Sequence, residues 1–142
     1  MEVTGKKIGF VLTGAYYTYP AIILQMKKLR NLDANIIPIM SNTAYNLDTK
    51  LGKAIDFVKE IENITHKSII HTIEDAESIG YNHLTDIMIV APASGNTISK
   101  LAYGIIDTPA TMAVRSHLRN DLPVVIAPAT VDGLRCKYGK YC

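Results

Sequence analysis

The sequence contains no tryptophan, only 2 phenylalanines and only 2 cysteines among its 142 residues. The cysteines, Cys136 and Cys142, both fall in the last seven residues, with five residues between them. That spacing is typical of neither a zinc site nor a redox pair. We therefore predict no metal site, and nothing in the cysteine usage indicates secretion.

Long apolar runs and an excess of one charge sign are also absent. No apolar stretch approaches the roughly 18 residues of a transmembrane helix. The short apolar run near the N-terminus ends in Thr13 and Gly14, which favours a first strand over a signal peptide. The formal net charge is +2, which argues against nucleic acid or an anionic membrane as the main partner. We expect a cytoplasmic protein that acts on a small-molecule substrate.

Hydrophobic residues make up 48% of the chain, enough for one domain with a core on both sides of a sheet. Pro38 interrupts one apolar run and places that strand near a sheet edge or a bulge, because proline cannot donate to a ladder. Apolar runs predict strands at 7–14, 34–41, 86–91 and 123–127, with a short third strand at 67–73. Helical periodicity predicts helices at 19–32, 49–65, 96–106 and 108–118.

The alternation of strands and helices predicts a three-layer, doubly wound α/β fold with a mainly parallel sheet. We expect the strand order 3-2-1-4-5, with the first and fourth strands adjacent at the switch point. Ligands of such sheets bind outside the carboxyl ends of the strands at that point. The residues at those ends therefore decide the functional interpretation.

Three strand ends carry small neutral residues with hydrogen-bonding groups. Gly14 follows the first strand, Ser41 and Thr43 follow the second, and Ser94–Thr97 follows the fourth, where we expect Pro92 to end the strand. Helix N-termini at these ends would suit an anion. Taken alone, Gly14 is equally well explained as part of a tight turn, and the residues after the second strand are better explained as an ordinary turn. Ser94 and Asn96 also fit a helix cap. We expect Lys100, one turn into the helix, to lie on a solvated face.

Several phosphate-binding and catalytic patterns are missing from these ends. The chain has no Gly-Lys-Ser/Thr loop and no three-glycine dinucleotide fingerprint. It has no serine between glycines for a hydrolase elbow, and no carboxylates for a phosphorylated aspartate. The residues alone predict a cofactor that carries a phosphate, without specifying which one.

The stretch APASGNTISKLAYGIIDTP resembles the Pro-Ala-Ser-Ala-Asn motif of the flavoprotein family that contains the homo-oligomeric flavin-containing cysteine decarboxylases. Similar stretches run in order from GKKIGFVLTG to LPVVIAPATVDGL, across about residues 5–134. The resemblance implies a Rossmann-like, flavodoxin-type domain over 1–134 that binds FMN. It also implies that these residues contact the cofactor: Gly14, Ala15, Tyr16, Ser41, Thr43, Ser94, Gly95, Asn96 and Thr97.

One position departs from the family pattern, because Ala15 stands where relatives often have serine. We expect Tyr16 or Thr18 to replace the missing hydroxyl. The cysteine decarboxylases carry a catalytic histidine upstream of the fourth strand, but the sequence around His71 and His83 differs from theirs. We expect both histidines to be solvated surface residues and assign no catalytic residue.

The ordered stretches are most similar to a branch of that family that forms dipicolinic acid from a dihydrodipicolinate precursor of the lysine pathway. The resemblance implies an oxidoreductase subunit in the mother cell of a spore-forming bacterium, with little or no activity alone. It implies a homo-oligomer that acts with a dehydrogenase-like A subunit, which uses NADP. Two alternatives stay open: an FMN-dependent decarboxylase of the wider family, and a non-catalytic partner subunit without flavin.

The resemblance ends at Leu134. The last segment, 135–142, reads RCKYGKYC and matches nothing in the family. We expect the family's final strand and helix to be missing, this segment to lie outside the sheet, and the strand at 123–127 to be less covered than in relatives.

Overall fold

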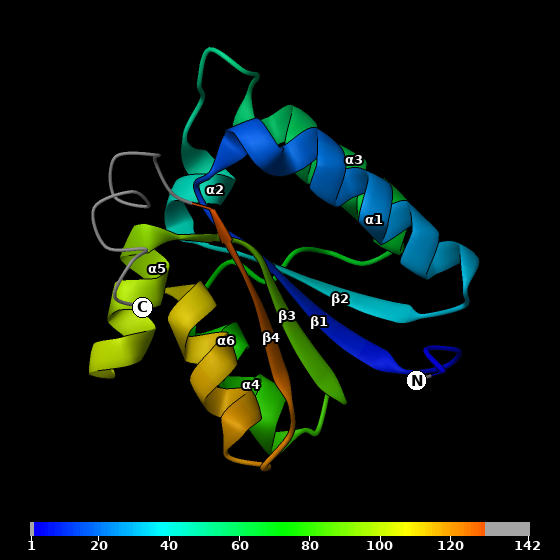
Figure 1. Cartoon of the computed structure of the whole chain (residues 1–142), viewed down its shortest axis with the longest axis vertical. Coiled ribbons are helices and arrows are strands. Elements are labelled where there is room, and N and C mark those ends of the chain that lie inside the picture. Colours follow the sequence, from blue (N-terminus) through cyan, green and yellow to red (C-terminus); the bar gives the residue numbers. More distant parts are fainter. Residues whose placement is uncertain (1, 130–142) are drawn as a thin grey trace, which may run out of the picture.

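A computed structural model describes residues 2–129, which form three layers around a central sheet (Figure 1). The sheet has four parallel strands in the order β2-β1-β3-β4. Their bounds are β1 Lys7–Leu12, β2 Asn35–Met40, β3 Ile87–Ser94 and β4 Val124–Ala129. Because β1 pairs with β3, the predicted adjacency of the first and fourth expected strands is confirmed.

Six α-helices and one 3-10 turn flank this sheet within the described residues. Helices α1 and α3 cover one face, and α4 and α6 cover the other with α5 beside α6 (Figure 1). Helix α2 and the turn η1 lie at the carboxyl end of the sheet. The bounds are η1 Tyr16–Thr18, α1 Tyr19–Asn31, α2 Asn42–Asn46, α3 Ala54–Thr65, α4 Ile73–Tyr81, α5 Gly95–Tyr103 and α6 Pro109–Leu118. None of these helices is long and apolar enough to span a bilayer.

Alternation along β1 builds the two cores that the composition predicts. Ile8, Phe10 and Leu12 pack in a cluster with side chains of α1 and α3. Val11 points to the opposite face and packs in a second cluster with side chains of α4 and α6. Strands β1, β2 and β3 are therefore largely buried on both faces, which is why they read as nearly continuous apolar runs.

The predicted third strand is wrong in extent. Of residues 67–73, only Ile70 makes a bridge, in parallel with Ile39 on the outer edge of β2. The Ile70 N–H donates to the Pro38 carbonyl at 2.9 Å, so the missing N–H of Pro38 faces this edge as expected. A helix that the sequence pattern did not predict, α4, begins at Ile73 after Thr72, whose hydroxyl caps it by accepting from the Asp75 N–H.

Several element bounds also differ from those predicted. Helix α3 begins at Ala54, because Thr49 and Gly52 pair in a turn before it. Strand β3 continues through Pro92 to Ser94, with a register shift between Val90 and Ala93. Helix α5 ends at Tyr103, where Gly104 takes a left-handed conformation with φ 70°.

Helix α6 begins as the sequence predicts. Thr108 and Thr111 form a capping box, and Pro109 occupies the first turn.

On β4, Val125 and Ile126 are exposed. Residues 135–142 lie outside the described residues, so the domain limit at 134 and the expected behaviour of that segment stay predictions.

The contact between α4 and α6 is a close helix crossing that depends on Gly80. The Gly80 N–H donates to Ser116 Oγ at 2.8 Å. A Cβ at this position would lie 2.3 Å from the Ser116 carbonyl oxygen, which is backbone and cannot move aside locally. Glycine is therefore required by packing, not by backbone conformation.

We expect Gly80→Ala to lower the free energy of unfolding by about 1–3 kcal/mol, the usual cost of overpacking. Urea denaturation of the purified chain measures it. Ser99→Ala, at an exposed position of α5, is the control, since it adds alanine's helix preference without a steric contact. Equal stability of Gly80→Ala and wild type would contradict the close crossing.

Candidate functional site

A polar pocket of about 450 Å³ opens at the carboxyl ends of β1, β2 and β3. Its wall comes from the segments that follow these three strands and from the connection between α5 and α6. The lining residues are Gly14, Ser41, Asn42, Thr43, Ser94, Asn96, Thr97, Lys100, Asp107 and Thr108. The structure therefore brings together six of the nine residues predicted from the sequence.

The start of α5 supplies one wall of the pocket. Ser94 is the N-cap, and its hydroxyl accepts from the Thr97 N–H at 3.3 Å and contacts the Thr97 hydroxyl at 3.0 Å. The N–H groups of Gly95 and Asn96 have no acceptor within the helix, because they belong to its first turn. These donors and the positive end of the helix dipole favour a negatively charged ligand.

The segment after β2 supplies the facing wall. Ser41 caps α2, and its hydroxyl accepts from the Ala44 N–H at 3.2 Å. Asn42 and Thr43 occupy the first turn and are exposed to the pocket. Gly14, after β1, does not use a positive φ. A Cβ there would make an ordinary van der Waals contact with Thr43 Cγ2 at 3.4 Å, so the two segments lie next to each other at this point.

Ala15 and Tyr16 lie behind this wall. Both are buried, and the Tyr16 hydroxyl donates to the Thr43 carbonyl at 2.5 Å. Burial, and to a smaller degree the charge of Asp48, raises the pKa of Tyr16, which keeps the phenol protonated as a donor. The Thr18 hydroxyl donates to the Ala15 carbonyl at 2.8 Å. Both hydroxyls that we expected to replace a serine at position 15 are thus bonded to backbone carbonyls.

Thr13, which the sequence analysis did not include among the site residues, links the strand ends that form the pocket. The Thr13 hydroxyl donates to the Pro92 carbonyl at 2.5 Å and accepts from the Ser94 N–H at 3.0 Å. The Thr13 carbonyl accepts from the buried Tyr19 hydroxyl at 2.7 Å. Thr13 thereby connects the ends of β1 and β3 and the beginning of α1. The signal was a polar residue at the end of an apolar strand, directly before the glycine.

Lys100 departs from the expectation of a solvated side chain. It lines the pocket, and its ammonium group pairs with Asp107, with Nζ 2.9 Å from Oδ1 and 3.1 Å from Oδ2. The Lys100 side chain is 22% exposed and that of Asp107 is 57% exposed. The other side chains of the lining are neutral, so this ion pair holds the only formal charges among the described lining residues.

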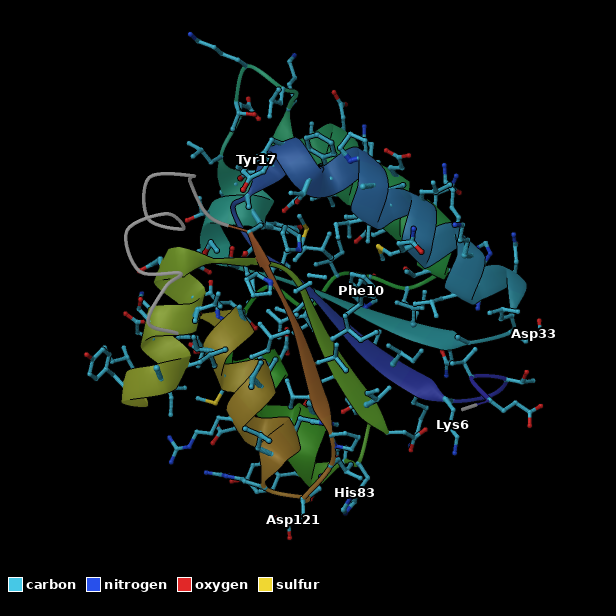
Figure 2. The ribbon with its side chains drawn as sticks, viewed as in Figure 1. Lys6, Phe10, Tyr17, Asp33, His83 and Asp121 are labelled. Carbon is cyan, nitrogen blue, oxygen red and sulfur yellow. The ribbon has the colours of Figure 1, made fainter. Side chains whose placement is uncertain are left out.

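The two candidate histidines lie in different places. Figure 2 shows His83 and Asp121 at the end of the molecule opposite to Tyr17, and His83 is exposed as expected. His71 is half-buried, and its ring stacks on Tyr45 of α2 with centroids 3.9 Å apart. The expectation of a solvated surface residue is therefore wrong for His71.

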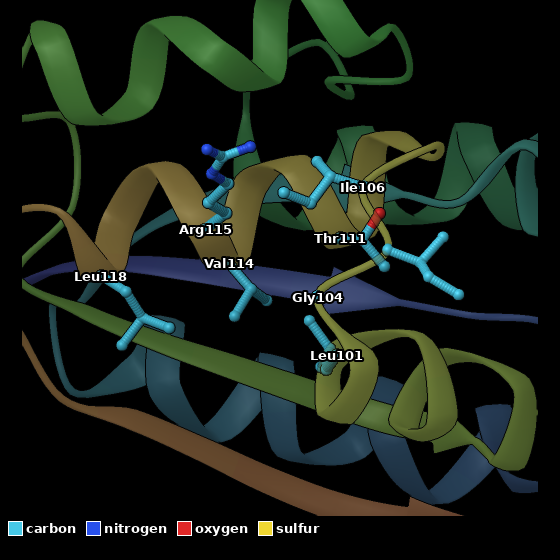
Figure 3. A pocket seen from close by; sticks show the side chains of 8 residues that line it. Leu101, Gly104, Ile106, Thr111, Val114, Arg115 and Leu118 are labelled. Atoms are coloured by element: carbon cyan, nitrogen blue, oxygen red, sulfur yellow. The ribbon is translucent and has the colours of Figure 1, made fainter.

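A second, apolar groove of about 390 Å³ lies between α5 and α6 (Figure 3). Leu101, Val114 and Leu118 supply much of its wall, and Arg115 contributes the one charged side chain of its lining. Gly104–Ile106 line this groove, while the next two residues, Asp107 and Thr108, line the polar pocket. The groove lacks the set of polar donors of the first pocket.

Comparison with known proteins shows the family to which this chain belongs. The family model described as Flavoprotein matches residues 1–132. The chain belongs to the flavoprotein family. It is 38% identical over 133 residues to the B subunit of dipicolinate synthase from Bacillus subtilis (strain 168), a match that covers 94% of this chain and 66% of the relative.

Solved structures agree with this assignment. The crystal structure of the dipicolinate synthase B subunit from Bacillus halodurans C matches with a TM-score of 0.81 and 36% identity, covering 94% of this chain and 69% of that chain. Burkholderia xenovorans DmrB, solved in complex with FMN, matches with a TM-score of 0.68 and 19% identity, covering 86% of this chain and 64% of that chain. At that identity, the second comparison shows the shared flavoprotein fold alone.

The arrangement of this flavoprotein's strand ends depends on the Thr13 hydroxyl, which a substitution can test. Thr13→Val keeps the side-chain shape but leaves the Ser94 N–H and the Pro92 carbonyl without this partner. We expect a loss of about 1–3 kcal/mol in the free energy of unfolding, the cost of leaving buried polar groups unpaired. Faster hydrogen exchange at the Ser94 amide should accompany it, measured by NMR.

Thr13→Ser is the matched control, because it keeps the hydroxyl: it should lose only about 0.8 kcal/mol for one buried methyl group and keep the slow exchange of the Ser94 amide. If the valine and serine variants have the same stability and the same exchange rate at Ser94, the hydroxyl does not organise the strand ends.

Proposed function

We propose that this chain is the flavin-binding B subunit of a dipicolinate synthase and that FMN occupies the polar pocket. The single observation that carries the proposal is the meeting of neutral donors from three strand ends in one pocket, in a chain 38% identical to such a subunit. Similarity to these relatives supports the reaction, and the pocket supports the cofactor class.

The residues present fit the FMN phosphate. A phosphate dianion is well held by hydroxyls and backbone N–H groups at helix N-termini, without a large cationic cluster. Ser41, Thr43 and the first turns of α2 and α5 offer this donor set. Gly14 lines the pocket with backbone alone.

When bound, FMN would supply the ability to accept or donate two electrons. The chain's own residues bind and orient it. Ser41 and Thr43 would hold the phosphate, and Ser94–Thr97 would contact the flavin along the start of α5. Tyr16 acts indirectly, because its hydroxyl fixes the Thr43 carbonyl and with it the first turn of α2.

The proposed reaction is the oxidation of a dihydrodipicolinate precursor to dipicolinic acid, together with an NADP-using A subunit. The site of action would be the mother cell of a sporulating bacterium, and the protein would form a homo-oligomer. The chain spans about two thirds of the length of the Bacillus subtilis relative, 66%. Likeness to two B subunits, at 38% and 36% identity, supports this assignment.

Titration with FMN tests the cofactor, and Asn96→Asp tests the pocket. A carboxylate at position 96 would repel the phosphate and remove an amide donor, so FMN binding should weaken by about 1–3 kcal/mol. Quenching of flavin fluorescence measures the Kd. An aspartate in the first turn of α5 interacts favourably with the helix dipole, so a lower affinity cannot be attributed to a less stable fold.

Asn63→Asp is the control, because it makes the same chemical change at an exposed position of α3. It should leave the Kd unchanged. Unchanged affinity of Asn96→Asp would contradict the pocket assignment. Failure of the wild-type chain to bind FMN would support the alternative of a partner subunit without flavin.

A further inference from the structure

We propose that Lys100 binds an oxyanion group of a ligand in the polar pocket and that Asp107 pairs with Lys100 until such a ligand replaces it. The inference rests on the proposed function for the ligands that it names. Their shared chemistry is a phosphate or carboxylate group: the phosphate of a flavin nucleotide or a carboxylate of the dicarboxylate substrate.

The position of Lys100 is the first step of the argument. Its side chain is mostly covered, at 22% exposed, although a lysine on a solvated helix face would extend into water. Side chains of a helix point back toward its N-terminus. From its place on α5, Lys100 therefore extends along the pocket wall toward the first turn, where Ser94, Asn96 and Thr97 line the same space.

The charge balance of the pocket is the second step. Lys100 is the one cation among the described lining residues, and Asp107 is the one anion. With the pair closed, the formal charge of the lining is zero. A bound phosphate or carboxylate would face a lining without net charge unless this ion pair opened.

The third step is that Asp107 can leave at low cost. Its side chain is 57% exposed, so its carboxylate can be rehydrated when the pair opens. An ion pair with such an exposed partner contributes little to stability, about 0–1 kcal/mol. Lys100, by contrast, is held in place by α5 and gains a charge-assisted hydrogen bond from any oxyanion that replaces Asp107.

The connection between α5 and α6 makes this exchange local. Asp107 lies directly before Thr108, whose capping box with Thr111 fixes the start of α6. The hydroxyl contact between Thr108 and Thr111, at 2.9 Å, does not involve Asp107. The carboxylate can therefore turn away while α6 keeps its cap.

The test uses two variants of the full chain, Lys100→Gln and Asp107→Asn, and four probes: FMN, riboflavin, inorganic phosphate and pyridine-2,6-dicarboxylate. Calorimetric titration gives each Kd. Lys100→Gln should weaken binding of the responding oxyanion by about tenfold or more, the effect of losing a charge-assisted bond. Asp107→Asn should tighten it by about three- to tenfold, because it removes both the competitor and a repulsive charge.

The Lys27–Glu60 ion pair between α1 and α3, at 3.6 Å, provides matched controls. Lys27→Gln and Glu60→Gln make the same charge changes away from the pocket and should leave every Kd unchanged. Thermal midpoints and circular dichroism of all four variants verify folding. Equal responses at the two ion pairs would show a general charge effect and overturn the inference.

The probes separate the two sources of the oxyanion. If the two variants change the Kd of FMN and of inorganic phosphate but not that of riboflavin, Lys100 binds the flavin phosphate. If the two variants change the Kd of pyridine-2,6-dicarboxylate but not that of FMN, Lys100 binds a substrate carboxylate. Either result supports the proposal.

The inference and the proposed function can fail separately. Suppose that FMN does not bind the wild-type chain, but the two variants change the Kd of phosphate or of the dicarboxylate as expected. The flavin proposal is then wrong, and the role of Lys100 as the oxyanion-binding residue is supported. Suppose instead that FMN binds, but Lys100→Gln changes the Kd of no probe, or Asp107→Asn raises the Kd. The role of Lys100 as the oxyanion-binding residue is then wrong, and the flavin proposal is unaffected.

Discussion

The structure of the site depends on one hydroxyl, that of Thr13. The pairing of β1 with β3 runs from Ile8 to Val11, and the register of β3 shifts between Val90 and Ala93. Beyond that point, the Thr13 hydroxyl makes the connection between the strands, as donor to Pro92 and acceptor from Ser94. Ser94 is also the cap of α5, so the same contact sets where the helix N-terminus points.

The rigidity behind this contact comes from close packing on both faces. A Cβ on Gly80 would lie 2.3 Å from the Ser116 carbonyl oxygen, so α4 and α6 approach each other closely, and Gly9 of β1 packs against the Met88 side chain of β3. The fully buried His117 joins further elements. Its Nε2 bonds to the Pro123 carbonyl at 3.0 Å, which requires an N–H there, so Nδ1 accepts from the Thr85 hydroxyl at 2.7 Å. A closely packed core of this kind leaves the strand ends little freedom to move.

The electrostatics of the pocket combine neutral donors with one cation that is already paired. Neutral hydroxyls and backbone N–H groups cost less to desolvate than charged side chains, and in a partly enclosed space they still stabilise an anion. The Lys100–Asp107 pair adds a charge that can be redirected, without leaving an unpaired ammonium group when the ligand is absent.

The sequence by itself determined the architecture and the end of the sheet at which the polar pocket lies. Apolar runs separated by periodic helices predict a parallel doubly wound sheet, and the polar residues after β1, β2 and β3 mark the end where the pocket forms. The start of the helix at 108 and the edge position of Pro38 were also predictable, because helix starts and proline constraints depend on a few neighbouring residues.

Only the tertiary structure decided the features that depend on distant contacts. Residues 67–73 have an apolar pattern that fits a strand, but only Ile70 forms a β-bridge, and α4 begins at the end of this segment. Pro92 does not end β3, because Thr13, 79 residues away along the chain, accommodates the irregular strand end. Lys100 turns into the pocket because the α5–α6 connection brings Asp107 within 2.9 Å. Short-range patterns carry no information about such pairs, since the partners meet only when the layers pack.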